Sequence, residues 1–104
     1  MRKARVYNFG NPAGELLEIE PRNKYKFVYL DEYNGQPVSL TMPVDKKEFT
    51  FEEFPSFFDG LLPEGIQLEA LIRQMKIDRN DLFSQLVQVG KDLVGSVTVE
   101  EITL

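Results

Sequence analysis

The sequence of 104 residues contains no cysteine and no histidine. Without cysteine, the chain can form no disulfide framework, thiolate nucleophile or cysteine-based zinc site. Without histidine, it lacks the commonest general base and the commonest metal ligand. These absences exclude most of the chemistry that small enzymes use. We therefore expect a non-catalytic protein with no cofactor and no bound metal.

Long hydrophobic runs are also missing from the chain. No stretch approaches the roughly 20 apolar residues that a membrane-spanning helix needs. The basic start, from Met1 to Arg5, continues into a strand-like segment and not into the apolar run of a secretory signal. We expect a cytoplasmic protein that does not contact a membrane.

Positive charge is in the minority, with 12 Lys and Arg against 17 Asp and Glu, and the net charge is −5. A chain of this charge repels a phosphate backbone at long range. We therefore expect no direct binding to nucleic acid. The simplest role of the acidity is solubility, and the alternative is an acidic face that meets a basic groove on a partner.

The chain does contain enough apolar residues for a core, 42% of the total, with eight Phe and four Tyr. One domain over residues 1–104 is expected at this length. Turn residues and alternation of apolar with polar positions predict the strands, and Asn34-Gly35 predicts a hairpin turn. The predicted strands are residues 3–9, 15–20, 24–30 and 38–42, with a last one from Val97 to about Leu104.

Helical spacing of apolar residues follows a polar connection predicted at residues 46–51. The first predicted helix has Pro55 in its first turn and carries Phe54, Phe57, Phe58, Leu61 and Leu62. The second opens at Pro63 and carries Leu68, Leu71, Ile72 and Met75. The third runs from Asp78 as N-cap to Gly90 as C-cap and carries Leu82, Phe83, Leu86 and Val87. This order predicts an α+β domain, with the helices packed on one face of a mostly antiparallel sheet.

The carboxylates form no pair suited to acid–base catalysis, and we expect them to lie on solvated faces. They include the glutamates at 15, 18 and 20. Acids at 78 and 81 are better explained by capping of a helix N-terminus than by a metal site. The glycines lack the context of a phosphate-binding loop. The phenylalanines between 49 and 58 are expected in the core and not as a base-stacking platform.

One segment does not fit a purely structural role. The stretch from Leu61 to Gln67 places a rigid Pro63, a flexible Gly65 and an apolar Ile66 between two helices, where a side chain can project outward. The alternative is that Ile66 packs back on the core as a hydrophobic staple.

Three blocks of sequence resemble the N-terminal subdomain of HipA-like serine/threonine kinase toxins in their order and spacing. They are residues 37–43 (PVSLTMP), 57–65 (FFDGLLPEG) and 90–97 (GKDLVGSV). The resemblance covers about Lys3 to Val99, and the central block is the most specific. One small departure is Ser96, where those kinases often have alanine. The ATP-binding and catalytic core of those kinases has no counterpart in this sequence.

As a free-standing subdomain, the chain is similar to the HipS family, the small antitoxins of HipBST toxin–antitoxin systems. This resemblance implies a bacterial antitoxin that binds a HipT-like kinase in trans, inhibits it without chemistry, and joins a ternary complex with a HipB-like helix-turn-helix DNA-binding protein. The predicted kinase-binding loop comprises Leu62, Pro63, Glu64, Gly65, Ile66 and Gln67.

Two other functions remain open at this point. The chain could be a structural or activating subunit that completes a split HipA-like kinase. It could also be a transcription-modulating partner of a HipB-like repressor, in which case it would bind the repressor without any kinase.

Overall fold

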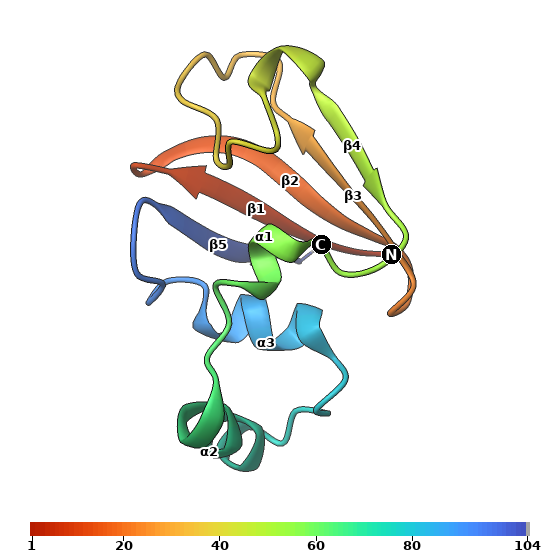
Figure 1. The fold of residues 1–104 in the computed structure, drawn as a ribbon, viewed down its shortest axis with the longest axis vertical. Coiled ribbons are helices and arrows are strands. Elements are labelled where there is room, and N and C mark those ends of the chain that lie inside the picture. The colour runs from red at the N-terminus through yellow and green to blue at the C-terminus, as the bar shows by residue number, and fades with distance from the viewer. Residues whose placement is uncertain (104) are drawn as a thin grey trace.

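The computed structural model describes residues 1–103. It consists of one five-stranded antiparallel sheet with three helices on one face (Figure 1). The strand order is β4-β3-β2-β1-β5. The predicted fold class is confirmed. The elements are β1 (Arg2–Asn8), β2 (Asn11–Glu20), β3 (Lys24–Tyr29), a 3-10 turn η1 (Val44–Lys46), β4 (Glu48–Phe51), α1 (Ser56–Asp59), α2 (Gly65–Met75), α3 (Leu82–Val89) and β5 (Val97–Ile102).

The first three strands form two consecutive hairpins, β1–β2 and β2–β3. The hairpin turn predicted at Asn34-Gly35 is wrong, because no strand lies between β3 and η1. The β1–β2 turn has only two central residues, Phe9 with φ 52° and Gly10 with φ 81°. Positive φ at both positions is what a type I′ hairpin turn requires. The last strand, β5, pairs with β1 and ends at Ile102, whereas Leu104 lies outside the described residues.

The strand predicted at residues 38–42 is wrong, because this segment is a loop with one isolated bridge between Ser39 and Met42. The buried hydroxyl of Tyr29 takes the place of strand pairing here. It donates to the carbonyl of Met42 at 2.6 Å and accepts from the amide of Val38 at 3.0 Å. Two backbone groups of the loop are therefore paired without a neighbouring strand, and the Met42 amide donates to the Ser39 carbonyl within the loop.

The predicted polar connection at residues 46–51 is also wrong, because β4 lies within it and pairs with β3. Phe49 is buried and Phe51 half-buried, while Glu48 and Thr50 are exposed. This alternation is the period-2 pattern of an edge strand with one face on the core.

The first helix is much shorter than predicted. Pro55 is its N-cap and not a first-turn residue, and α1 covers only the four residues to Asp59. A turn follows, closed by a hydrogen bond from the amide of Leu62 to the carbonyl of Asp59. The third helix is capped by Asp81 and not by Asp78, because the Asp81 side chain accepts from the amide of Ser84 at 3.1 Å.

The core lies between the sheet and the α1–α3 layer, where α3 packs against β5. Phe27 of β3 approaches Phe58 of α1 with ring centroids 5.9 Å apart. The predicted core role of the 49–58 phenylalanines is confirmed: Phe49, Phe54 and Phe58 are buried, while Phe51 and Phe57 pack partly buried against them.

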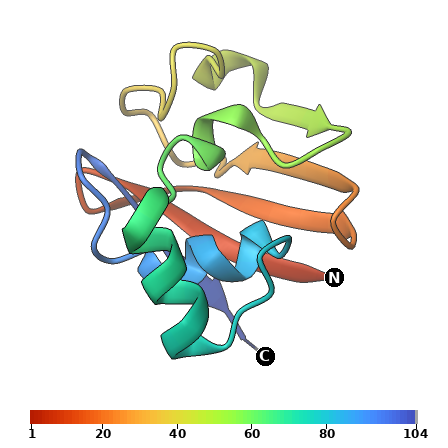
Figure 2. The same ribbon diagram turned by 60° about the horizontal axis from the view of Figure 1, so that its bottom comes forward.

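Helix α2 is the exception to this packing. It contains no buried residue and makes only sparse backbone contacts with the other elements. In two views it lies outside α3, away from the sheet (Figures 1 and 2). The predicted apolar face is present but only half-buried at Leu68, Leu71 and Ile72, and Met75 is exposed. Within residues 1–103, no helix is long and apolar enough to cross a membrane.

Candidate partner-binding surface

The predicted loop connects α1 to α2 and divides into an anchor and an exposed part. Leu62 belongs to the buried core and Pro63 is half-buried, so these two residues hold the loop on the body of the domain. Glu64, Gly65 and Ile66 are exposed, as is Gln67. The structure therefore brings the predicted residues together but leaves the Leu62 side chain inaccessible to a partner.

Ile66 is 88% exposed, so the staple alternative is wrong. The helical period of about 100° per residue explains its position. Leu68, Leu71, Ile72 and Met75 fall on one side of α2, and Ile66 falls on nearly the opposite side, near Glu69 and Arg73. An isoleucine on the polar face of a helix is not required by the packing of that helix.

Gly65 sets the direction in which the loop enters α2. It has φ +59°, a left-handed conformation in the first residue of the helix, and a Cβ atom there would meet nothing within 4 Å. The glycine is therefore required by backbone conformation and not by close packing. Because the chain turns sharply at this residue, Ile66 projects from the first turn of the helix.

A groove of about 410 Å³ runs beside the loop. Leu61, Pro63 and Gln67 line one wall, and Val89, Leu93 and Val94 line the other. Val94 is 95% exposed. Residues 91–95 connect α3 to β5, and no local pattern in the sequence indicates that they lie beside the kinase-binding loop predicted above.

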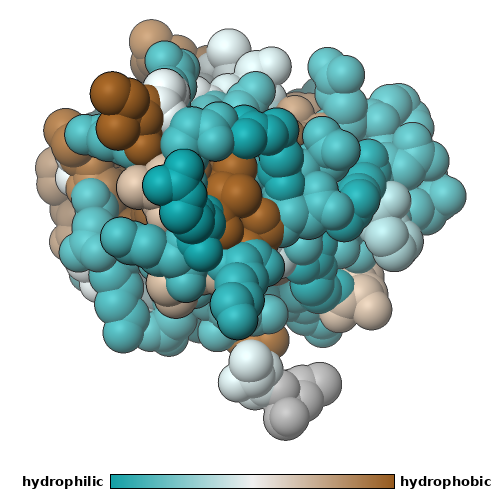
Figure 3. Space-filling model, turned by 90° about the horizontal axis from the view of Figure 1, so that it is seen from below, coloured by the Kyte–Doolittle hydropathy of each residue, from teal (hydrophilic) through white to brown (hydrophobic). Residues whose placement is uncertain are grey.

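The face of the molecule seen from below is largely hydrophilic. Apolar atoms gather on the left side of this view and also show between hydrophilic residues near its centre (Figure 3). On this face the apolar atoms are therefore unevenly distributed, and single exposed apolar side chains such as Leu40 and Ile19 occur elsewhere in the fold.

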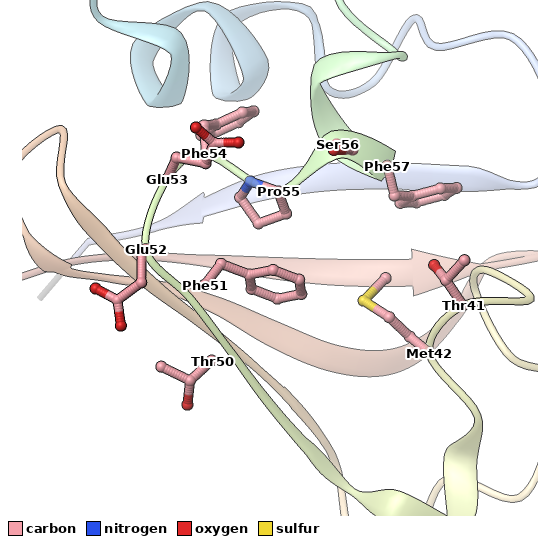
Figure 4. Close-up of a pocket in the computed structure, with 10 residues that line it drawn as sticks. All are labelled: Thr41, Met42, Thr50, Phe51, Glu52, Glu53, Phe54, Pro55, Ser56 and Phe57. Carbon is pink, nitrogen blue, oxygen red and sulfur yellow. The ribbon is translucent and has the colours of Figure 1, made fainter.

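A second hollow, of about 560 Å³, lies between β4 and α1. Its base is apolar: the side chains of Phe51 and Met42 point toward each other beneath Pro55 (Figure 4). Glu52 and Glu53 are exposed at its rim, and no Lys or Arg lines it. A carboxylate in open solvent has neither the apolar surroundings nor the partner that acid–base catalysis needs, so this hollow contains no catalytic arrangement.

Three charged side chains, Arg2, Glu18 and Asp81, form an ion-pair cluster at the start of β1, here called the Arg2 clamp. The Arg2 Nε atom lies 2.8 Å from Glu18 Oε1, and Arg2 Nη2 lies 2.8 Å from Asp81 Oδ1. The guanidinium also sits 4.7 Å from the centroid of the Phe83 ring. These contacts join β1, β2 and the N-terminus of α3.

Glu18 is a correction to the prediction that all carboxylates are solvated, because it is only 3% exposed. Burial alone would raise the pKa of Glu18, but hydrogen bonds from Arg2, the Arg22 amide and Tyr25 outweigh it and hold the pKa below its ordinary value. Burial, assisted by Glu18, raises the pKa of Tyr25 to about 12. The carboxylate is therefore charged near neutral pH and serves the clamp.

Asp81 combines two structural roles. Burial would raise its pKa, but hydrogen bonds from Arg2 and from Ser84 lower it to about 2. Asp78 accepts from the Asn80 amide at 2.7 Å and pairs with Arg22 at 3.3 Å. The capping interpretation of these acids is correct for Asp81. Among residues 1–103, no group of three potential ligands could hold a metal ion.

Comparisons with known proteins agree with this fold. A family model described as the HipA N-terminal domain matches residues 4–100. An uncharacterized protein of Haemophilus influenzae is 29% identical over 101 residues, which cover 97% of this chain and 93% of that protein. A Sinorhizobium fredii protein named "Putative kinase Y4mE" is 30% identical over 73 residues, covering 70% of this chain and 17% of that protein.

A solved structure supports the same relationship. The N-terminal domain of HipA toxin superposes with a TM-score of 0.77 at 26% identity, covering 99% of this chain and 94% of the other. The matched region is the N-terminal domain and not the catalytic kinase domain. Sequence and fold agree over nearly the whole chain, and we conclude that it belongs to the HipA N-terminal domain family.

Proposed function

We propose that this chain is an antitoxin that binds a HipT-like serine/threonine kinase in trans and neutralises it without chemistry. The contact is made through the loop from Leu62 to Gln67, near the kinase active site. The observation that carries the proposal is the exposure of Ile66 on the polar face of α2, beside a groove that continues the same surface.

The energetic argument starts from the cost of leaving Ile66 in water. Burying an isoleucine side chain is worth about 1.5–3 kcal/mol. The fold does not gain this energy, because Ile66 is 88% exposed. A partner that covers the loop gains it, and Leu62 and Pro63 hold the start of the loop on the body of the domain.

Inhibition in this proposal is non-covalent. A loop held against the kinase can block entry of its substrate, or hold its active site in an unproductive arrangement. The proposal needs no catalytic step by this chain. The charged Arg2 clamp stabilises the fold, and the sequence has neither histidine nor cysteine. A ternary complex with a HipB-like DNA-binding protein is part of the same proposal.

The alternative of a completing or activating subunit has one observation in its favour. The solved relative is a domain of a HipA toxin, so a domain of this kind occurs as part of a kinase toxin. The two functions predict opposite phenotypes. An antitoxin rescues growth from the kinase, whereas a completing subunit is required for toxicity.

The test is co-expression with the proposed partner, a HipT-like kinase. We expect wild-type protein to restore growth and Ile66→Asp to fail, because a buried carboxylate at this position is unfavourable in the complex. With purified proteins, the Kd should rise at least about tenfold for Ile66→Asp.

The matched control is Met75→Asp, which places the same charge on an exposed apolar position at the other end of α2. It should rescue growth as wild type does, and both variants should keep the circular dichroism spectrum. Toxicity that appears only when wild-type protein is present would overturn the antitoxin function in favour of the completing subunit. Binding to the HipB-like repressor alone would favour the transcriptional alternative.

A further inference from the structure

The β1–β2 turn contains a residue that its backbone conformation does not favour. Phe9 occupies the first central position with φ 52°, where Asn, Asp or Gly is preferred. A bulky residue is rare at positive φ and strained there. The Phe9 side chain gains little in return from the fold, because it is 73% exposed. Strain without a packing gain points to a function for this side chain.

A second exposed apolar side chain lies on the neighbouring turn. The Phe9 amide donates to the carbonyl of Ser96 at 2.9 Å, which joins the β1–β2 turn to the turn between α3 and β5. Both views show the two turns side by side at one end of the sheet (Figures 1 and 2). Val94, on the second turn, is 95% exposed.

The groove links these turns to the loop of the proposed function. Val94 and Leu93 line the wall opposite Pro63 and Gln67, so one continuous surface leads from the loop to the Val94 turn. Exposed acids, Asp59, Glu64 and Asp92, lie along this stretch against a single exposed base, Lys91. The surface is therefore apolar at its centre and acidic at its edges.

We propose that the kinase contact extends from the 62–67 loop across the groove to Phe9 and Val94, which form its second apolar contact. This inference rests on the proposed function. The occupant is a surface element of the kinase that places an apolar side chain in the groove and basic side chains opposite the acids. Such complementarity favours a specific partner and a fast encounter.

The test compares the effect of a substitution on the stability of the domain with its effect on the affinity for the kinase. Phe9→Asn creates an Asn-Gly type I′ turn, so it should keep or raise the Tm. The same variant should raise the Kd for the HipT-like kinase about tenfold or more. Val94→Ser should weaken binding in the same direction with an unchanged Tm.

The control is Ile19→Asn, an exposed apolar residue near the other end of β2, about 25 Å along the strand from the turn. It should leave the Kd unchanged. If Ile66→Asp weakens binding while Phe9→Asn and Val94→Ser do not, the extended contact is wrong and the proposed function stands. If wild-type protein does not bind the kinase at all, both proposals fail.

Discussion

Gly90 ends α3 at the point where the helix meets the last strand. The amide of Val99 donates to the Gly90 carbonyl at 2.9 Å. A Cβ atom on Gly90 would lie only 1.9 Å from the Val99 carbonyl oxygen. The absence of a side chain, and not backbone freedom, is therefore what this position requires, since its φ is an ordinary −56°.

We expect Gly90→Ala to lower the free energy of unfolding by about 2–3 kcal/mol, because α3 or β5 must shift to accommodate the methyl group. Urea denaturation followed by circular dichroism measures this loss. Gly60→Ala is the control, because its Cβ would make only ordinary contacts of 3.5 Å. Equal stability of the two variants would contradict the close approach of α3 to β5.

Single residues also show which parts of the site were predictable. The sequence predicted the loop, and the helical phase of Ile66 against Leu68 and Leu71 could have settled its exposure in advance. Nothing local marks Val94 as exposed, because its surroundings depend on how α3 and β5 pack. The pairing of Glu18 with Arg2 could not be predicted either, because the partners are distant in the sequence and meet only through sheet register.

At the level of elements, α2 differs from the rest of the domain. It is amphipathic, but it contains no buried residue and packs sparsely on α3. Segments with few buried contacts open locally more often than core elements do. Partner binding at its first turn would then order a helix that the isolated domain holds only weakly.

Amide hydrogen exchange should reveal this difference directly. We expect the α2 amides to exchange much faster than those of α3, which carries Phe83 and Leu86 in the core. Addition of the HipT-like kinase should slow exchange at the start of α2. Protection of α2 equal to that of α3 in the free domain would contradict the description of α2 as loosely held.

Two neighbouring segments show why two predictions failed, the strand at residues 38–42 and the polar connection at residues 46–51. Residues 38–42 and 48–51 both alternate apolar with polar side chains. Only the second pairs with β3, whereas in the first the Val38 amide and the Met42 carbonyl hydrogen-bond to the hydroxyl of Tyr29. Local alternation cannot distinguish these outcomes, since the deciding hydrogen bonds join segments that are apart in the chain.

At the level of the whole molecule, the Arg2 clamp holds the sheet to the helical layer. Glu18 and Asp81 have lowered pKa values in the folded state, about 2 for Asp81. Unfolded carboxylates titrate at about 4. Below that pH the unfolded chain binds more protons than the folded one, so stability falls as the pH is lowered.

We expect the free energy of unfolding to decrease by about 1–2 kcal/mol through these groups between about pH 4 and pH 2, allowing for the partial exposure of Arg2. Urea titrations at several pH values measure this. In Arg2→Met the pH dependence over this range should be weaker. An unchanged dependence would show that the clamp does not determine acid stability.

The pairing of β5 with β1 has a consequence for the order of folding. Lys3 pairs with Ile102, so this ladder joins residues separated by almost the whole described chain, whereas the other three ladders join consecutive strands. Contacts between distant residues are slow to form. The groove also needs both the 60–67 segment and the 89–94 segment. Under the proposed function, a chain in which these two segments have not yet packed together presents no complete surface to the kinase, so inhibition begins only after they meet.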